Sequence, residues 1–216
     1  MTRLGVVGIL ILHFSLLILP AFGQVITTVA GGQWVFRGDG GRATGVPVGE
    51  IGAVAVDSAG NVFVADFGNN LVFKISPSGV LTLVAGNGFF GLSGDGGAAT
   101  AAALNIPASV AVDSGGNLYI SDQANQRIRK VAANGIITTL VGSGPTGAFE
   151  GGFSGDGGPA TSATLSIPNH VAVDGAGNLY IADSANWRIR RVNSGGTITT
   201  VAGGGTCFLW GGGPIG

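Results

Sequence analysis

Aspartates recur at two fixed positions along this 216-residue chain, and a carboxylate is a good ligand for a metal ion such as calcium. Three aspartates precede glycine turns and three end short apolar runs: Asp57, Asp113 and Asp174, then Asp66, Asp122 and Asp183. A calcium loop needs several oxygen ligands within one short stretch, whereas each of these motifs supplies a single carboxylate. We therefore predict that the six aspartates cap turns and strand ends, and that they form no metal site.

Arginines supply the concentrated positive charge of the sequence. They follow two of these aspartates at the same distances: Arg127 and Arg129 after Asp122, then Arg188 and Arg190 after Asp183. One alternative is a structural ion pair between each aspartate and one of its two arginines. The other is an anion-binding strip, because the planar guanidinium group matches a carboxylate or sulfate. The four arginines are therefore candidate ligand-binding residues for an acidic partner.

Groups that could catalyse a reaction are scarce. A nucleophilic triad needs a base and an orienting acid, and beyond the N-terminal apolar run the chain holds a single histidine, His170. Glu50 and Glu150 lie in unmatched loops, and no phosphate-binding G-x-x-x-x-G-K-[ST] loop occurs. Ten basic and eleven acidic residues give a formal charge of −1, which argues against nucleic-acid binding. We predict no enzyme activity, no cofactor and no nucleic-acid partner.

Aromatic side chains offer another kind of binding site. Six of them lie in variable segments just before Gly-Asp-Gly-Gly motifs: Trp34, Phe36, Phe89, Phe90, Phe149 and Phe153. Loops on a rigid scaffold are frequent binding surfaces, so we take these residues as candidates to bind a protein or glycan. Local packing over the glycine turns is the alternative.

An internal repeat positions all of these residues. The segment VAVDSAGNVFVAD at 54–66 recurs as VAVDSGGNLYISD 56 residues later and as VAVDGAGNLYIAD after a further 61 residues. Short runs rich in Val, Ile, Tyr and Phe between glycine turns predict four strands per unit, in the second unit roughly at 110–112, 118–121, 127–131 and 136–141. Four antiparallel strands per unit are typical of a β-propeller blade, so the predicted fold is all-β with about three blades.

The motifs also carry a family resemblance. The run from SGDGG through PAT and a Leu-x-x-Pro to VAVD, GNLYIAD, NxRIRKV and ITTVAG resembles the bacterial NHL-repeat family over about residues 25–203. The resemblance implies a propeller, commonly six-bladed, whose exported members act mostly as binding or scaffold modules, although some relatives are lyases. Those lyases draw histidines from several blades, and such histidines are missing here. The first unit departs from the pattern with Leu71 and Phe73 in place of arginines.

The N-terminus predicts export. A basic start, the apolar run 4–19 and small residues at Ala21 and Gly23 match a secretory signal peptide that is cleaved after residue 23. The apolar run is shorter than the roughly 20 residues that span a bilayer, so we expect no stable membrane span after cleavage. The predicted organisation is a signal peptide at 1–23, propeller blades at 24–203 and an atypical tail at 204–216, in a protein that is extracellular or periplasmic.

Three blades fall below the range of about 4 to 8 with which propellers close. Either two or more chains assemble, with a homodimer as one such assembly, or this sequence is the front half of a longer protein, and the aberrant tail favours the second alternative. The expected function is an exported, non-catalytic binding or scaffold module for protein or glycan ligands. The alternative is a fragment of a secreted propeller lyase or hydrolase whose catalytic residues lie outside this chain.

Overall fold

The computed structural model describes residues 38–147 and 149–204 of the chain. The predicted signal peptide at 1–23, the candidate residues Trp34 and Phe36, and the tail from residue 205 lie outside these described residues. The organisation expected at the two ends of the chain therefore stays a prediction.

Short β-branched and aromatic runs form three four-stranded antiparallel sheets in the described residues, one per repeat. The first blade contains β1 (Ile51–Val56), β2 (Val62–Asp66), β3 (Leu71–Ile75) and β4 (Leu81–Ala85). The second contains β5 (Pro107–Val112), β6 (Leu118–Asp122), β7 (Arg127–Val131) and β8 (Ile137–Val141). The third contains β9 (Pro168–Val173), β10 (Leu179–Asp183), β11 (Arg188–Val192) and β12 (Ile198–Gly203). The predicted all-β fold with three blades is confirmed.

The strands predicted for the second unit agree with the structure to within one residue, except at the first strand. β5 begins at Pro107 rather than at Val110, because Pro107 pairs with Asp122 beyond a register shift between Pro107 and Ser109. A shift of this kind is a β-bulge, which a pattern of apolar residues does not reveal. The Asn134-Gly135 hairpin signal is correct, since Gly135 takes a φ of +83° in the turn between β7 and β8.

Five short 3₁₀ helices accompany the strands of the described residues: η1 (Ala43–Gly45), η2 (Ala99–Ala101), η3 (Gln123–Asn125), η4 (Ala160–Ser162) and η5 (Ser184–Asn186). η2 forms in the alanine-rich connection between the first two blades, where Ala99 and Ala102 pack into the core. None of these helices has the length and apolar character needed to cross a membrane.

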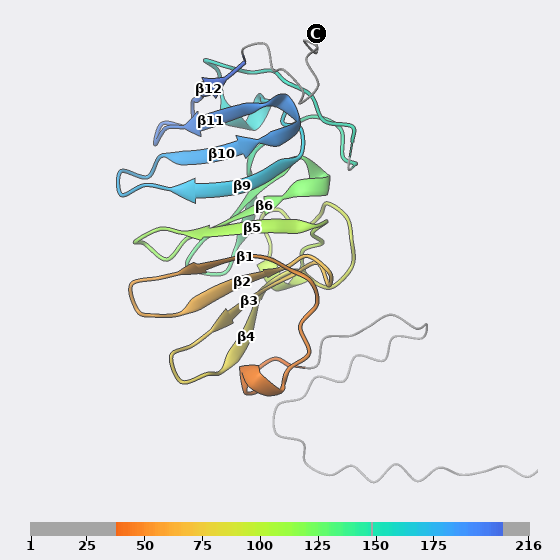
Figure 1. Cartoon of the computed structure of the whole chain (residues 1–216), viewed down its shortest axis with the longest axis vertical. Coiled ribbons are helices and arrows are strands. Elements are labelled where there is room, and N and C mark those ends of the chain that lie inside the picture. Colours follow the sequence, from red (N-terminus) through yellow and green to blue (C-terminus); the bar gives the residue numbers. More distant parts are fainter. Residues whose placement is uncertain (1–37, 148, 205–216) are drawn as a thin grey trace, which may run out of the picture. The chain divides into compact units, whose positions relative to one another are not determined.

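The blades pack side by side, with β5 between β1 and β9 (Figure 1). One core cluster lies between the first and second blades and includes Phe63, Val72, Val110 and Ile120. A second lies between the second and third blades and includes Ile128, Val171 and Ile181. Burying an aliphatic side chain of this size contributes about 1.5–3 kcal/mol, so the contacts between blades supply much of the apolar burial. Neighbouring blades therefore share much of their apolar core, and a third cluster, which includes Val64 and Phe73, lies within the first blade.

Candidate functional site

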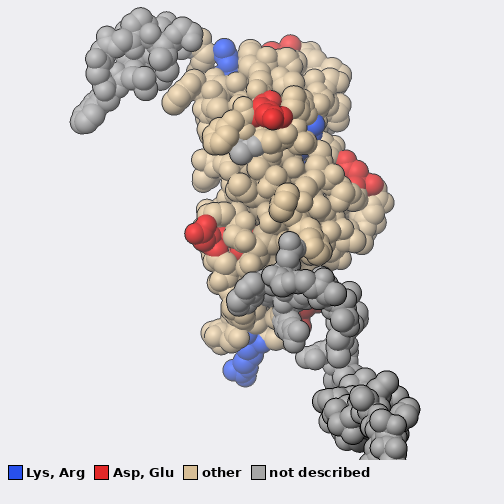
Figure 2. All heavy atoms as spheres, turned by 90° about the vertical axis from the view of Figure 1, so that its right-hand side faces the viewer, with Lys and Arg blue, Asp and Glu red and all other residues tan. Residues whose placement is uncertain are grey.

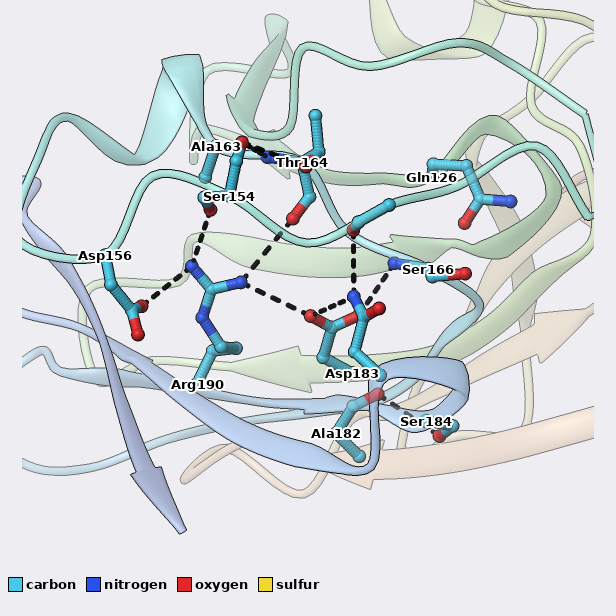
Figure 3. Close-up of polar contacts among 12 residues, drawn as sticks. Gln126, Ser154, Asp156, Ala163, Thr164, Ser166, Ala182, Asp183, Ser184 and Arg190 are labelled. Atoms are coloured by element: carbon cyan, nitrogen blue, oxygen red, sulfur yellow. Dashed lines mark hydrogen bonds and ion pairs between the residues drawn. The ribbon is translucent and has the colours of Figure 1, made fainter. Parts of the chain in front are cut away.

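Arg190 of β11 lies at the centre of a buried polar cluster that joins the third blade to the loop leading into it (Figure 3). Its guanidinium group donates to the carboxylates of Asp183 at 3.3 Å and Asp156 at 2.9 Å. It also donates to the backbone oxygens of Ser154 at 2.9 Å and Thr164 at 3.5 Å. The side chains of Arg190 and Asp183 are fully buried, whereas that of Asp156 is 37% exposed. The cluster therefore holds one ion pair in the interior and a third charge near the surface.

The buried carboxylate of Asp183 has further partners. It accepts hydrogen bonds from the backbone N–H of Ser166 at 2.7 Å and from Nδ2 of Asn186 at 2.8 Å. Asn186 also donates to the backbone oxygen of Gly152 at 2.8 Å. Burial raises the pKa of Asp183, while these hydrogen bonds and the charge of Arg190 act in the opposite direction. The contacts fasten the inter-blade loop to the blade, as expected of a structural ion pair.

The second blade repeats this cluster. Arg129 donates to the carboxylates of Asp122 at 3.2 Å and Asp95 at 2.8 Å. Asp122 accepts further bonds from the backbone N–H of Asn105 at 2.7 Å and from Nδ2 of Asn125 at 2.8 Å. Burial raises the pKa of Asp122 to about 6, although the bonds from Asn125, Asn105 and Arg129 oppose the rise. The structure thus pairs Asp122 with Arg129, one of the two partners that the sequence left open.

The first blade builds the same position without an arginine. Phe73 stands in place of Arg129 and Arg190, and its side chain is fully buried. Asp66 keeps three donors there: the backbone N–H of Gly49 at 2.8 Å, the backbone N–H of Asn69 at 3.1 Å, and Nδ2 of Asn69 at 2.9 Å. An aspartate at the end of the second strand therefore accepts hydrogen bonds in all three blades, and an arginine adds an ion pair to it in the second and third blades.

The other two candidate arginines have different surroundings. Arg127 is 7% exposed and donates to backbone oxygens, including that of Gly144 at 2.5 Å. Arg188 is half-buried, and its guanidinium carbon lies 4.0 Å from the centre of the Phe153 ring, at the distance of a cation–π contact. Of the four arginines, Arg188 alone is more than slightly exposed. The anion-binding role stays a prediction, and Arg188 is the residue best placed for it.

The aspartates that precede the glycine turns act within those turns. Asp57 accepts bonds from the backbone N–H of Asn61 at 2.9 Å and from Nδ2 of Asn61 at 2.7 Å, and the side-chain bond lowers the pKa of Asp57. Equivalent pairs make both bonds in the other blades: Asp113 with Asn117, and Asp174 with Asn178. Across the described ranges, no three His, Cys, Asp or Glu side chains are grouped so that they could hold a metal ion.

Two inter-blade loops carry exposed aromatic side chains, and we call them the aromatic loops: residues 87–93, and residues 144–147 with 149–153. Their phenylalanines are exposed by 48% at Phe89, 75% at Phe90, 88% at Phe149 and 42% at Phe153. Leu92, which the sequence did not single out, is also 38% exposed. Phe153 packs against Arg188, so the alternative of local packing applies to part of its ring. Phe90 and Phe149 expose most of their surfaces to solvent.

Both aromatic loops are anchored on the same short helix, η3. Nδ2 of Asn125 donates to the backbone oxygen of Gly91 at 2.7 Å, which holds the first loop. The backbone N–H of Gly147 donates to the backbone oxygen of Ala124 at 2.8 Å, which holds the second. Because Ala124 and Asn125 are consecutive, the two loops are fixed next to each other.

Charged side chains are sparse on the side of the molecule that Figure 2 shows, where acidic and basic groups form separate small spots on a mostly uncharged surface. This side is the right-hand side of Figure 1, where the connections between successive blades lie. A partner that binds here meets mainly uncharged groups.

Sequence reasoning missed the acidic residues of the Gly-Asp-Gly-Gly motifs. Asp95 and Asp156 complete the two arginine clusters, and each lies 34 residues before its arginine, Arg129 or Arg190. Asp39 precedes Phe73 by the same distance in the first unit, where it accepts a bond from the backbone N–H of Leu83 at 2.7 Å. This constant spacing is the feature of the sequence from which the contact between aspartate and arginine could have been predicted.

Comparison with known proteins identifies relatives of this fold and sequence. The family model of the Teneurin NHL domain matches residues 90–150 and 144–208, which together cover more than half of the chain. Teneurin-4 of Mus musculus is 33% identical over 165 residues, which is 70% of this chain and 5% of the relative. The chain therefore spans a small part of the length of the teneurins that it matches.

Solved structures support the propeller architecture alone, because their identities are low. A Bacteroides thetaiotaomicron protein of unknown function is 22% identical with a TM-score of 0.54, over 66% of this chain and 47% of that one. A chain in the nidogen/laminin complex is 20% identical with a TM-score of 0.52, over 74% of this chain and 51% of that one. The bacterial origin suggested by the sequence motifs stays a prediction.

Proposed function

The chain belongs to the family of the Teneurin NHL domain, and from this premise we propose that it is an exported, non-catalytic β-propeller module that binds a protein partner through its aromatic loops. The observation that carries the proposal is the position of those loops. Two loops with largely exposed phenylalanines are anchored side by side on η3. Large aromatic side chains on a fixed backbone are the usual anchors of protein–protein interfaces.

The loop backbones are held from within the chain, which leaves their apolar side chains available. Asn87 accepts a bond from the backbone N–H of Phe89 at 3.0 Å and donates to the backbone oxygen of Ala101 at 3.1 Å. The hydroxyl oxygen of Ser93 accepts a bond from the backbone N–H of Ala103 at 3.1 Å. A loop that is already ordered loses less conformational entropy on binding, which favours affinity.

A protein surface fits this chemistry better than a glycan does. Sugar recognition combines an aromatic face with free polar groups that bind the hydroxyls, and here Asn87 and Ser93 are engaged by the loop backbone. Phe90 and Phe149, by contrast, expose 75% and 88% of their surfaces. Their burial against an apolar patch of a partner would contribute about 25 cal/mol per Å² of apolar surface removed from water.

Export and the absence of catalysis belong to the same proposal. The N-terminal pattern of a basic start, an apolar run and small residues supports export. His170 is exposed on β9, away from any group of three His, Cys, Asp or Glu side chains in the described residues, which supports a binding role. The partners and activities of whole teneurins are not transferred, since this chain covers 5% of such a relative.

The test compares wild type with the double variant Phe90→Ser/Phe149→Ser. Each protein is immobilised and exposed to the extracellular proteins of its source organism, and separately to a glycan array. We expect a defined protein to be retained by wild type and lost with the double variant, because the variant removes both exposed aromatic anchors.

The matched control is Thr138→Ser, an exposed residue on β8 that lies outside the aromatic loops. It should retain the partner as wild type does. Equal retention of the partner by the loop variant would contradict the proposal. Retention of a glycan that requires Phe90 and Phe149 would replace the protein partner with a glycan.

A further inference from the structure

The exposed large hydrophobic side chains of the described residues fall into three groups, and the aromatic loops account for only one. The second group lies on and just before β1, and we call it the leading face: Val48, Ile51, Val54 and Val56, exposed by 49%, 41%, 60% and 61%. The third lies on the third blade, and we call it the trailing face: Trp187, Ile189 and Val201, exposed by 58%, 40% and 47%. These blades are at opposite ends of the row of three (Figure 1).

The leading face is exposed because the first blade has no neighbour on that side among the described residues. Along β1, Val54 and Ala55 point to opposite faces of the sheet, and Ala55 packs against the second blade. The positions that correspond to Val48 and Val54 in the other repeats are buried: Leu104 at 0% and Leu165 at 1%, then Val110 at 4% and Val171 at 7%. In those repeats the preceding blade covers the same face.

The trailing face is likewise exposed because the third blade has no neighbour on that side among the described residues. Ile189 corresponds to Ile128 and Val72, which are both fully buried against the following blade. Its neighbour Ala202 is exposed, although the equivalent residues Val141 and Ala85 are fully buried. The sequence therefore provides both ends of the row with residues suited to an interface.

The two faces are the two sides of one repeated interface. Val72, an equivalent of trailing Ile189, lies in one core cluster with Val110, an equivalent of leading Val54. Ile128 and Val171 are the matching pair between the second and third blades. A trailing face therefore complements a leading face in shape and apolar character.

We propose that the occupant of each face is a second copy of this chain, bound head to tail so that the trailing face of each copy packs on the leading face of the other. The three blades of the described residues make six in a pair, and six is the only multiple of three within the range of about 4 to 8 blades in which propellers close. The pair has twofold symmetry and contains two equivalent junctions, so no face of this kind is left uncovered.

The proposed junction between copies lacks a hydrogen bond that both internal junctions contain. Oδ1 of Asn70 accepts a bond from the backbone N–H of Ile106 at 2.9 Å, and Oε1 of Gln126 accepts one from Ile167 at 2.6 Å. The third residue of this series is Trp187, which has no acceptor atom and instead offers a large apolar ring. The junction between copies therefore relies on apolar contact, and we expect reversible, concentration-dependent association.

The test measures the mass of the chain as an exporting host delivers it, by analytical ultracentrifugation over a range of concentrations with reductant present. We expect a species of twice the mass of one chain. The variants Val54→Glu and Ile189→Lys should each weaken association by at least about 100-fold, since each places an unpaired charge in both junctions of the pair. The control Phe90→Ser changes a more exposed apolar side chain outside the two faces and should leave association unchanged.

Mixing the two charged variants tests the head-to-tail geometry. A mixed pair contains one wild-type junction and one junction in which Glu at position 54 meets Lys at position 189, so the double mass should return. Far-UV circular dichroism establishes that each variant is folded, and Val56→Glu or Val201→Lys replaces a variant that is not.

Three results would overturn the proposal: a wild-type protein that has the mass of one chain at every concentration, a dimer that is insensitive to both charges, or a mixture that stays dissociated. The first would indicate that the faces are covered by other blades of a longer polypeptide.

Discussion

Replacing Arg190 with leucine tests whether the buried arginine clusters are structural. The substitution removes a fully buried guanidinium group and leaves the Asp183 carboxylate buried without its ionic partner. Removing one member of a buried ion pair typically costs about 3–5 kcal/mol of unfolding free energy. Asp183 keeps the bonds from Ser166 and Asn186, much as Asp66 is held by backbone and amide donors beside Phe73. We therefore expect the lower end, about 3 kcal/mol.

For a domain of this size, about 3 kcal/mol corresponds to a decrease in Tm of about 6–12 °C. Thermal and urea unfolding followed by circular dichroism measure both quantities. The double variant Arg190→Leu/Asp183→Asn should recover at least half of the loss, because it also removes the buried charge. Arg188→Leu is the matched control: this half-buried side chain contacts the Phe153 ring, and its loss should change the unfolding free energy by no more than about 1 kcal/mol.

A loss below about 1 kcal/mol for Arg190→Leu would refute this reasoning. So would a double variant that is less stable than the single one. Either result would favour the anion-binding alternative, in which the arginines contribute to a ligand rather than to the fold.

Two further predictions concern pH and backbone strain. Because folding raises the pKa of Asp122 from an ordinary value of 3.8 to about 6, the folded protein binds the proton more tightly and this stabilising contribution is lost as pH rises through 6. The stability of wild type relative to Asp122→Asn should therefore fall by about 2 kcal/mol between pH 4 and pH 7 in urea unfolding, and an increase would contradict the assignment. Gly142 has a φ of +107°, and an added Cβ would lie 2.5 Å from the backbone oxygen of Gln126. Gly142→Ala should thus cost about 2 kcal/mol or more by the same assay, whereas Gly135→Ala, at φ +83° with open space around it, should cost about 1 kcal/mol.

The fold was predictable because its information is local and repeated. Alternating apolar runs and glycine turns predict each strand of a blade, and three near-copies remove most of the ambiguity of a single pattern. The start of β5 at Pro107 was missed, because it depends on a bulge rather than on periodicity.

The partner of Asp122 was not predictable in the same way. Arg127 and Arg129 are two residues apart on one strand and point to the same face, so alternation does not distinguish them. Tertiary contacts do: Arg129 reaches Asp95 in the preceding loop, whereas Arg127 reaches the backbone of Gly144 in the following loop. The exposure of Phe90 and Phe149 was also not predictable from the sequence, because a loop has no periodicity that indicates which side chains face solvent.

Equivalent positions in the three repeats show which residues are buried within their own blade and which are buried by contact with the neighbouring blade. Phe73, Arg129 and Arg190 differ completely in chemistry and are all fully buried, so the blade itself determines burial at that position. Val54 and Val110 occur in nearly the same sequence, yet are 60% and 4% exposed, so burial on the blade face depends on the neighbouring blade. β1 is nevertheless fully paired with β2 from Ala53 to Val56. Its exposed valines thus form part of an ordered surface, and a partner that binds there has little conformational entropy to overcome.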